Sequence, residues 1–232
     1  RDIIDVNVLG TTNVLELAKA VQPRRFVYLS SRTIYGILDQ DPKRPEEEWL
    51  GRPQRLYPMS KYAGELIALR YGEVFGFDVR VARVTGAYGP MERKSEYRPN
   101  MSALHDWTAA AMTGREIKVP NLTPIMDTTH VSDVATGVVA ILTGSPHYPV
   151  YNVGAEEEHT VGEILRTLTE LVPGTLYSVD RAEDWSDRRN FVIGGHARLT
   201  RLYADLSFRH KYPLKTGLQQ YLKWRHDLKY FD

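Results

Sequence analysis

Apolar residues recur at three- and four-residue spacing through the first twenty positions, with polar residues between them. This spacing predicts an amphipathic helix over 3–21, which Pro23 ends. An uninterrupted apolar run over 26–29 then predicts a short strand buried in a parallel sheet. A second amphipathic pattern over 57–76 predicts another helix, and residues 79–84 predict the next strand.

Helical and strand patterns continue to alternate to the end of the chain. The alternation predicts the α/β class with a largely parallel sheet. The later predicted helices cover 100–112, 131–142 and 160–172, with a short helix near 199 and a last one from 216. The later predicted strands cover 117–119, 150–153 and 176–179. Thr160 and Glu163 have the spacing of a capping box, which marks a helix start.

Two polar stretches are interpreted as solvated surface. The polar, proline-rich segment over 36–56 contains an acidic run at 46–48, which we interpret as an exposed loop. Arg24 and Arg25 precede a strand and are interpreted as a solvated turn.

Composition narrows the class of protein. The 232 residues suit one large domain or one and a half ordinary ones, and the formal charge of +1 argues against a nucleic-acid partner. Cysteine is absent, which excludes disulfides and thiolate chemistry and suits a reducing cytoplasm. No apolar run is long enough to predict a membrane span, and no histidine pair has the spacing of a zinc protease, so neither a membrane nor a metal is expected.

The most informative stretch is Tyr57-Pro58-Met59-Ser60-Lys61. A phenol and an ammonium four residues apart at a helix start share one face of the helix. The ammonium stabilises a phenolate, which makes the tyrosine a usable base near neutral pH. Such a pair could take a proton from an alcohol while hydride leaves the carbon. The same spacing also occurs by chance on ordinary helix surfaces, so the neighbouring sequence decides whether the pair is interpreted as catalytic.

That context is a set of hydroxyls at strand ends. The strand over 26–29 runs into Ser30 and Ser31, and the next strand ends in a turn over 85–90. Side chains at the carboxyl ends of parallel strands face the crevice where α/β proteins bind ligands. A serine there can hydrogen-bond a substrate hydroxyl or carbonyl.

Six segments together resemble the extended short-chain dehydrogenase/reductases, the NAD-dependent epimerase/dehydratase group. Their order and spacing match the family across nearly the whole chain. The segments are Asn7-Val8-Leu9-Gly10-Thr11-Thr12-Asn13-Val14-Leu15, 26–36, 57–61, 83–90, 127–135, and 151–154 with 160–161. The resemblance implies a Rossmann-type doubly wound parallel sheet with a smaller α/β substrate-binding region. It implies that 1–90 with 131–155 form the cofactor domain, and that 91–130 with 156–232 form the substrate-binding region.

The resemblance also implies residue roles. Tyr57 is expected to be the general base or acid, Lys61 to hold the nicotinamide ribose hydroxyls, and Ser31 to bind the reacting oxygen. The expected cofactor-binding residues are Asn7, Leu29, Ser30, Tyr57, Lys61, Val84 and Thr85. The expected substrate-binding residues are Ser31, Thr33, Gly86 and Asn100.

The implied activity is hydride transfer with NAD or NADP. The expected enzyme is an epimerase, dehydratase or oxidoreductase acting on a sugar, a sugar nucleotide or a related hydroxy compound. The two long helices, after Asp2 and after Tyr57, have apolar residues on more than one face. In the family these helices form a dimer interface, so the resemblance implies a homodimer.

Two positions depart from the sugar-nucleotide members of the family. Gly86 replaces an asparagine that contacts the diphosphate, and Met126 replaces an arginine that also meets phosphate. Each lost charge-assisted bond is worth about 1.5–3 kcal/mol. A smaller substrate becomes more plausible, although Arg93, Arg188 or Arg189 could compensate.

The front of the chain departs further. The family begins with a strand, a Gly-x-x-Gly-x-x-Gly turn and a helix that binds the cofactor pyrophosphate. This chain opens at Arg1 inside a predicted helix and contains no such motif. Three interpretations follow: an enzyme of this family, a non-catalytic binding relative that has lost the cofactor site, or an incomplete chain of the enzyme.

Overall fold

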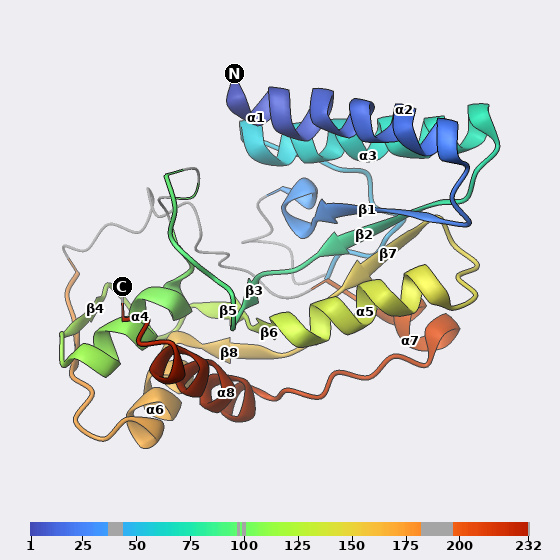
Figure 1. The fold of residues 1–232 in the computed structure, drawn as a ribbon. Coiled ribbons are helices and arrows are strands. Elements are labelled where there is room, and N and C mark those ends of the chain that lie inside the picture. Colours follow the sequence, from blue (N-terminus) through green and yellow to red (C-terminus); the bar gives the residue numbers. More distant parts are fainter. Residues whose placement is uncertain (37–43, 97, 99–100, 182–196, 232) are drawn as a thin grey trace. The chain divides into compact units, whose positions relative to one another are not determined.

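The computed structural model describes residues 1–36, 44–96, 98, 101–181 and 197–231. Figure 1 shows the arrangement of their helices and strands. The chain divides into two compact units, which are described separately. Unit 1 contains 1–85, 134–154 and 197–209, and unit 2 contains 86–133, 155–196 and 210–232.

Unit 1 is built on a three-stranded parallel sheet in the order β1-β2-β7. Helices α2 and α3 lie side by side over one face of this sheet (Figure 1). Its strands are β1 (Phe26–Ser31), β2 (Val79–Val84) and β7 (Val150–Val153). Its helical elements are α1 (Asp2–Ile4), η1 (Asp5–Gly10), α2 (Thr11–Val21), η2 (Arg32–Tyr35), α3 (Leu56–Phe75), most of α5 (Val131–Thr143) and α7 (Thr200–Leu206).

The core of unit 1 lies between its sheet and the helices. Aliphatic side chains of β2 and β7 pack with residues of α2 and α3 near the amino ends of the strands. Helix α5 approaches β7 closely at Gly137, where an added Cβ would lie 2.7 Å from Val153 Cγ1. Arg25 stabilises the end of α5, because its Nη1 donates to the carbonyl oxygens of Ile141, Leu142 and Gly144.

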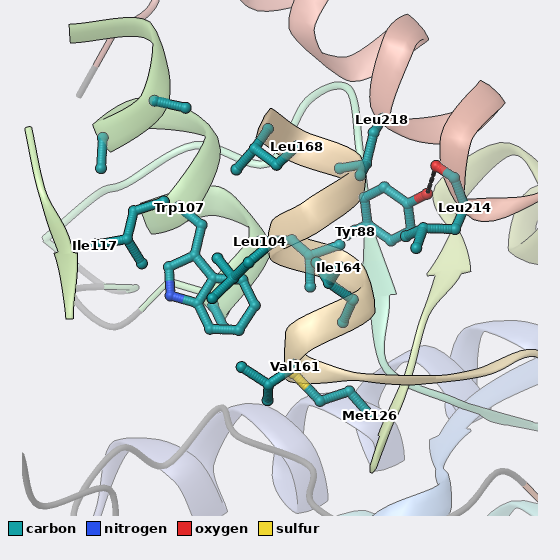
Figure 2. Close-up of a cluster of buried hydrophobic side chains, with 14 of the residues drawn as sticks. Tyr88, Leu104, Trp107, Ile117, Met126, Val161, Ile164, Leu168, Leu214 and Leu218 are labelled. Carbon is teal, nitrogen blue, oxygen red and sulfur yellow. Dashed lines mark hydrogen bonds between the residues drawn. The ribbon is translucent and has the colours of Figure 1, made fainter. Parts of the chain in front are cut away.

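In its described residues, unit 2 contains three two-stranded pairings and three helices, together with the first residues of α5. Strands β3 (Ala87–Tyr88) and β6 (Thr129–His130) pair in parallel, as do β4 (Ile117–Val119) and β9 (Tyr177–Val179), whereas β5 (Ile125–Asp127) and β8 (Glu158–Thr160) pair antiparallel. Its helices are α4 (Ala103–Thr113), α6 (Val161–Leu171) and α8 (Leu214–Asp227). Figure 2 shows the apolar cluster between these elements, where Trp107, Ile164 and Leu218 are buried.

The sequence predicted the class and most of the long elements. The α/β class with a parallel sheet is confirmed, and the helix predicted over 57–76 is α3 with a left-handed Gly76 at its end. The capping box is confirmed, since the Thr160 Oγ1 accepts from the Glu163 backbone N–H and the Glu163 carboxylate accepts from the Thr160 N–H. Among the described residues, no helix has the length and apolar character needed to cross a bilayer.

Some expectations were wrong in detail. The helix predicted over 3–21 is interrupted by the π-helix η1. Arg25 is not a solvated turn residue, because its side chain is 11% exposed and binds Asp78 at 2.6 Å. The acidic run is not uniformly solvated either: Glu47 is buried, whereas Glu46 and Glu48 are exposed. In both cases a distant backbone or side-chain partner compensates for burying the charge.

Candidate active site

The carboxyl ends of β1 and β2 carry the hydroxyls expected at the site. The register pairs Ser31 with Val84, so these residues end neighbouring strands at one edge of the sheet. The Ser31 Oγ lies 2.9 Å from Thr33 Oγ1 and accepts from the Thr33 backbone N–H at 3.3 Å. Ser31 is also the N-cap of η2, so its hydroxyl is held at the start of a short helix.

Ser30, unlike Ser31, has a hydroxyl without a hydrogen-bond partner among the described residues. Its side chain is buried, and within the described residues no group lies within hydrogen-bond distance of its Oγ. A buried hydroxyl without a partner is unusual, because its desolvation costs about 1–3 kcal/mol. Leu29 next to it is half exposed, Val84 ends the adjacent strand, and Thr85 follows it. The edge therefore offers one unsatisfied polar atom beside apolar surface.

Tyr57 is the second residue of α3 and is half exposed. Two hydrogen bonds fix the turn on which it lies. The Ser60 Oγ donates to the Tyr57 carbonyl oxygen at 2.8 Å, and the Asn7 Nδ2 donates to the same Ser60 Oγ at 2.9 Å. Asn7 lies in the π-helix η1, an irregularity that is frequent at functional sites. Asn7 thus supports the start of α3 from the preceding helix.

Lys61 lies one turn further along α3 and is partly buried. Its Nζ is 4.5 Å from the centre of the Tyr28 ring, and the Tyr28 hydroxyl donates to the Lys61 carbonyl oxygen at 3.2 Å. Burial lowers the pKa of Lys61, and the nearby Glu65 carboxylate opposes this effect. The ammonium therefore lies over an aromatic face, and the charge of Glu65, one turn further along the same helix, acts on it.

Gly64 allows these helices to approach closely. A Cβ at this position would clash with the Tyr28 hydroxyl and would lie 2.8 Å from the Asn7 carbonyl oxygen. The absence of a side chain at Gly64 is therefore a condition for bringing Asn7, Tyr28 and Lys61 together.

Beneath these residues lies a buried ion pair that the sequence analysis did not identify. The Arg83 Nη2 is 2.6 Å from Glu65 Oε1, and the two side chains are 5% and 1% exposed. The other terminal nitrogen of Arg83, Nη1, donates to the Tyr35 hydroxyl at 2.8 Å and to the Glu47 carbonyl oxygen at 2.9 Å. One signal was present in the sequence, because Glu65 continues the four-residue row of Tyr57 and Lys61.

The bonds extend from this pair to β7. The Tyr35 hydroxyl donates to Asn152 Oδ1 at 2.8 Å, and the Asn152 backbone N–H donates to Glu47 Oε1 at 2.9 Å. Burial raises the pKa of Tyr35 to about 12, although the Arg83 charge opposes the rise. Tyr35 therefore remains a neutral hydroxyl near pH 7, able to accept from Arg83 and donate to Asn152 at once.

The expected substrate residues are less fully described. Thr33 lies in η2 next to Ser31. Gly86 follows β2, its carbonyl oxygen accepts from the Thr129 N–H at 3.3 Å, and an added Cβ would lie 3.4 Å from the Asp127 carbonyl oxygen. Asn100 lies outside the described residues, as do Arg188 and Arg189.

Unit 2 contains Met126, one of the two positions that depart from the sugar-nucleotide pattern, and Arg93, one of the arginines that could compensate. Met126 is buried in the apolar cluster, where Figure 2 shows it beside Val161. Its side chain contributes to packing and supplies no charge. The Arg93 guanidinium lies 5.6 Å from the Trp224 ring, so it is held by an aromatic contact of the same unit. No acidic and histidine side chains of the described part of the chain gather into a metal site.

Similar sequences extend over the whole chain. Residues 1–154 match the family model described as "NAD dependent epimerase/dehydratase family". UDP-glucuronate 4-epimerase 6 of Arabidopsis thaliana is 29% identical over 242 residues, covering 97% of this chain and 50% of the relative. dTDP-glucose 4,6-dehydratase of Streptomyces griseus is 30% identical over 226 residues, covering 96% of this chain and 65% of the relative. The chain thus spans between 50% and 65% of the length of these relatives.

A solved structure shares the fold. The UDP-glucuronic acid 4-epimerase of Bacillus cereus, in complex with UDP-glucuronic acid and NAD, superposes with a TM-score of 0.79 at 21% identity. The match covers 97% of this chain and 68% of that chain. The Rossmann-type fold that the motifs implied is confirmed by this similarity.

Proposed function

Because the chain belongs to the NAD-dependent epimerase/dehydratase family, we propose that the protein catalyses a hydride-transfer reaction on a sugar-like alcohol or carbonyl. The observation that carries the proposal is the pairing of a half-exposed Tyr57 phenol with a partly buried Lys61 ammonium one helical turn away. Both lie on the helix that packs against β1, β2 and η2, where Ser30, Ser31 and Thr33 are found.

In this proposal each residue has one task. Tyr57 accepts the proton of a substrate hydroxyl, or returns it to a carbonyl oxygen in the reverse direction. Lys61 stabilises the phenolate by its charge, and the Asn7–Ser60 bonds keep the first turn of α3 in place. The Ser31 hydroxyl, oriented by Thr33, donates to the reacting oxygen. The reaction is therefore divided between a base, a cation and an orienting hydroxyl.

The residues of unit 1 fit a nicotinamide cofactor at this edge of the sheet. The buried Ser30 Oγ needs a hydrogen-bond partner, and Leu29 offers exposed apolar surface beside it. We propose that Lys61 binds the ribose and that Asn7, Ser30, Val84 and Thr85 line the nicotinamide. NAD or NADP supplies or accepts the hydride when bound.

The substrate class follows from the relatives and from two positions of this chain. By their names, the relatives act on UDP-glucuronate and dTDP-glucose, both sugar nucleotides. We propose a sugar nucleotide or a smaller sugar-like compound for this protein, with 91–130 and 156–232 as the substrate-binding region. Met126 is buried in the unit 2 core and Gly86 has no side chain, which favours the smaller substrate. Turnover of matched sugars with and without the nucleotide separates these two classes.

Cofactor titration in the complete protein tests the function. Lys61→Met should weaken the binding of NAD or NADP by about tenfold or more, since it removes a charged hydrogen-bond donor. Lys19→Met is the matched control. Lys19 is on α2, and its ammonium also lies over an aromatic ring, 4.4 Å from the centre of the Phe75 ring. Calorimetry measures both. A folded wild-type protein that binds neither nucleotide would instead support the non-catalytic relative.

We also propose that a second copy of the chain covers α2 and α3. Large apolar side chains are exposed on η1, α2 and α3; they are Val6, Leu9, Val14, Leu17, Val21, Met59, Leu66 and Val74. Contiguous exposed apolar surface of this kind marks an association site. Light scattering should report twice the chain mass, and Leu17→Glu should shift it toward the monomer. A monomer at high concentration contradicts this part of the proposal.

A further inference from the structure

The Glu65–Arg83 ion pair joins the parts of the candidate active site. Glu65 is on α3, one turn after Lys61 and two turns after Tyr57. Arg83 is on β2, directly before Val84 and Thr85. The single pair therefore connects the helix of the proposed base with a strand end of the proposed cofactor site.

The pair has little freedom to move. Arg83 Nε lies 3.2 and 3.3 Å from the two Glu65 oxygens, and Nη2 adds the contact at 2.6 Å, so the guanidinium binds the carboxylate through two nitrogens. The remaining Nη1 donates to the Tyr35 hydroxyl of η2 and to the Glu47 carbonyl oxygen. All three side-chain nitrogens of Arg83 are thus hydrogen-bonded, which restricts movement of the ion pair.

Stability of the fold does not account for the pair by itself. Buried ion pairs often stabilise a fold no better than apolar residues of similar volume, because both charges lose their hydration. The same strand shows the apolar alternative, since Val79 and Val81 on it are buried in an aliphatic cluster. What an apolar pair cannot supply is a fixed negative charge one helical turn from Lys61.

The groups around Lys61 and Glu65 determine how strongly the Glu65 carboxylate acts on the Lys61 ammonium. Tyr28 of β1 faces the ammonium with its ring, and Tyr57 and Glu65 are its titratable neighbours on α3. Arg83 of β2 and Tyr35 of η2 face Glu65 from the far side. Glu65 is the acid whose charge opposes the effect of burial on the pKa of Lys61.

We propose that Glu65, anchored by Arg83, is a positioning residue that keeps Lys61 charged and holds α3 in register with the strand ends. It acts through Lys61 and touches neither substrate nor cofactor. This inference rests on the proposed function for its meaning in catalysis, but its electrostatic part is measurable without turnover.

The primary experiment is an NMR titration of the complete protein labelled with ¹³C at lysine Cε. The Lys61 signal is assigned by its disappearance in Lys61→Arg. In Glu65→Gln this signal should titrate at a pH lower by about one unit, because a neutral amide no longer opposes burial and the Arg83 charge is unbalanced.

Glu47→Gln is the matched control. Glu47 is also buried and belongs to the same set of bonds, but it meets Asn152 and Arg201 and is not among the charges that act on Lys61. The glutamine side-chain oxygen in Glu47→Gln can still accept from the Asn152 backbone N–H. The Lys61 titration should be unchanged in Glu47→Gln and nearly unchanged in Glu65→Asp, which keeps the charge.

The pH profile of kcat/KM gives the catalytic readout. Removing a negative charge favours the deprotonated forms of neighbouring groups, so both limbs should move to lower pH in Glu65→Gln and stay in place in Glu65→Asp. A purely structural role would lower the rate at all pH values without moving either limb. That result, or an unshifted Lys61 titration in folded Glu65→Gln, overturns the proposal.

Two further outcomes are interpretable. If Glu65→Gln does not fold, the double variant Glu65→Gln/Arg83→Gln removes both charges. Lys61 should then titrate at a pH between that of the wild type and the value expected for Glu65→Gln. A titration identical to wild type overturns the proposal.

If the wild type shows no turnover but the Lys61 signal shifts as expected, the proposed function fails while the electrostatic role of Glu65 is supported.

Discussion

The two ends of the unit 1 sheet are built from different chemistry. At the amino ends of the strands, Val79, Val81 and Val150 pack with Leu15 and the other apolar residues of the cluster. Only two residues further along β2, and on the same side of the strand, the buried side chain is the charged Arg83. The comparison teaches that one strand can serve packing at one end and binding at the other.

The difference has a physical reason. Aliphatic side chains need only neighbours of suitable shape, whereas each buried polar group needs a partner of its own. At the carboxyl end Arg83, Tyr35 and Asn152 satisfy one another, whereas the Ser30 hydroxyl has no partner among the described residues. Mutations at the two ends should therefore change different properties.

The largest effect is expected from Tyr57→Phe at the carboxyl end. Removing the proposed base should lower turnover by about a thousandfold, within the usual range for a general acid or base. The melting temperature should not change, because the Tyr57 side chain is half exposed. Tyr71→Phe, on the same helix but bonded to Glu16, is the control and should keep wild-type activity. Retained activity in Tyr57→Phe would remove the assignment.

Leu15→Ala at the amino end should show the opposite behaviour. Leu15 is fully buried, so the truncation should lower the free energy of unfolding by about 2–5 kcal/mol through lost burial and a cavity. Cofactor affinity of the folded protein should be unchanged. Urea denaturation measures the loss, and Leu50→Ala, at an 80% exposed position, should cost less than about 0.5 kcal/mol. Equal losses in the two variants would contradict the assignment of the core.

Tyr35→Phe should give an intermediate loss. The Tyr35 hydroxyl accepts from Arg83 and donates to Asn152, so its removal leaves two buried groups unsatisfied, at a cost of about 1–3 kcal/mol. Its raised pKa adds a pH dependence with a definite sign. Above pH 10 the unfolded chain loses this proton first, so the free energy of unfolding should fall by about 1.4 kcal/mol per pH unit up to about 12.

Urea denaturation between pH 9 and 11.5 measures that slope, at intervals of about half a unit. In Tyr35→Phe the slope should be shallower by the contribution of one tyrosine. A slope that is identical in the two proteins would show that Tyr35 is not a buried neutral hydroxyl.

The smallest effect on stability is expected from Ser30→Ala. Its Oγ is buried without a partner in the described chain, so its removal should leave the free energy of unfolding unchanged or raise it by about 1 kcal/mol. Cofactor affinity should nevertheless fall about five- to tenfold, the worth of one neutral hydrogen bond. Ser60→Ala is the contrasting variant, because the Ser60 Oγ makes two bonds and its loss should destabilise the fold by about 1 kcal/mol. The same stability change in both variants would contradict the distinction.

The sequence predicted what local patterns determine. Periodicity located α3, α5 and α6 within a few residues, and short hydrophobic stretches located β1 and β2. The short strands β3, β5, β6 and β8 were not predicted. No apolar run marks these segments in the sequence, and they become strands by pairing with distant segments.

Partners distant in sequence explain the other differences. Glu47 is buried because Asn152, more than a hundred residues away, donates to it, and nothing in the acidic run itself indicates this. Arg25 likewise depends on the end of α5. The π-helix η1 lies between α1 and α2 in one unbroken helical run, so the apolar pattern predicts a single helix and does not reveal the change in hydrogen bonding. The roles of Tyr57, Lys61 and Ser31 were inferred from family motifs and remain predictions.

Gly64 determines how closely α3 can approach Asn7 and Tyr28. It is the point where α3 meets the Asn7 carbonyl oxygen and the Tyr28 hydroxyl without a side chain between them, three residues from Lys61. Any added atom there has to push the helix outward, and the displacement is transmitted directly to the ammonium. Redesign of this scaffold for new substrates should therefore vary Thr33 or Gly86 and leave position 64 untouched.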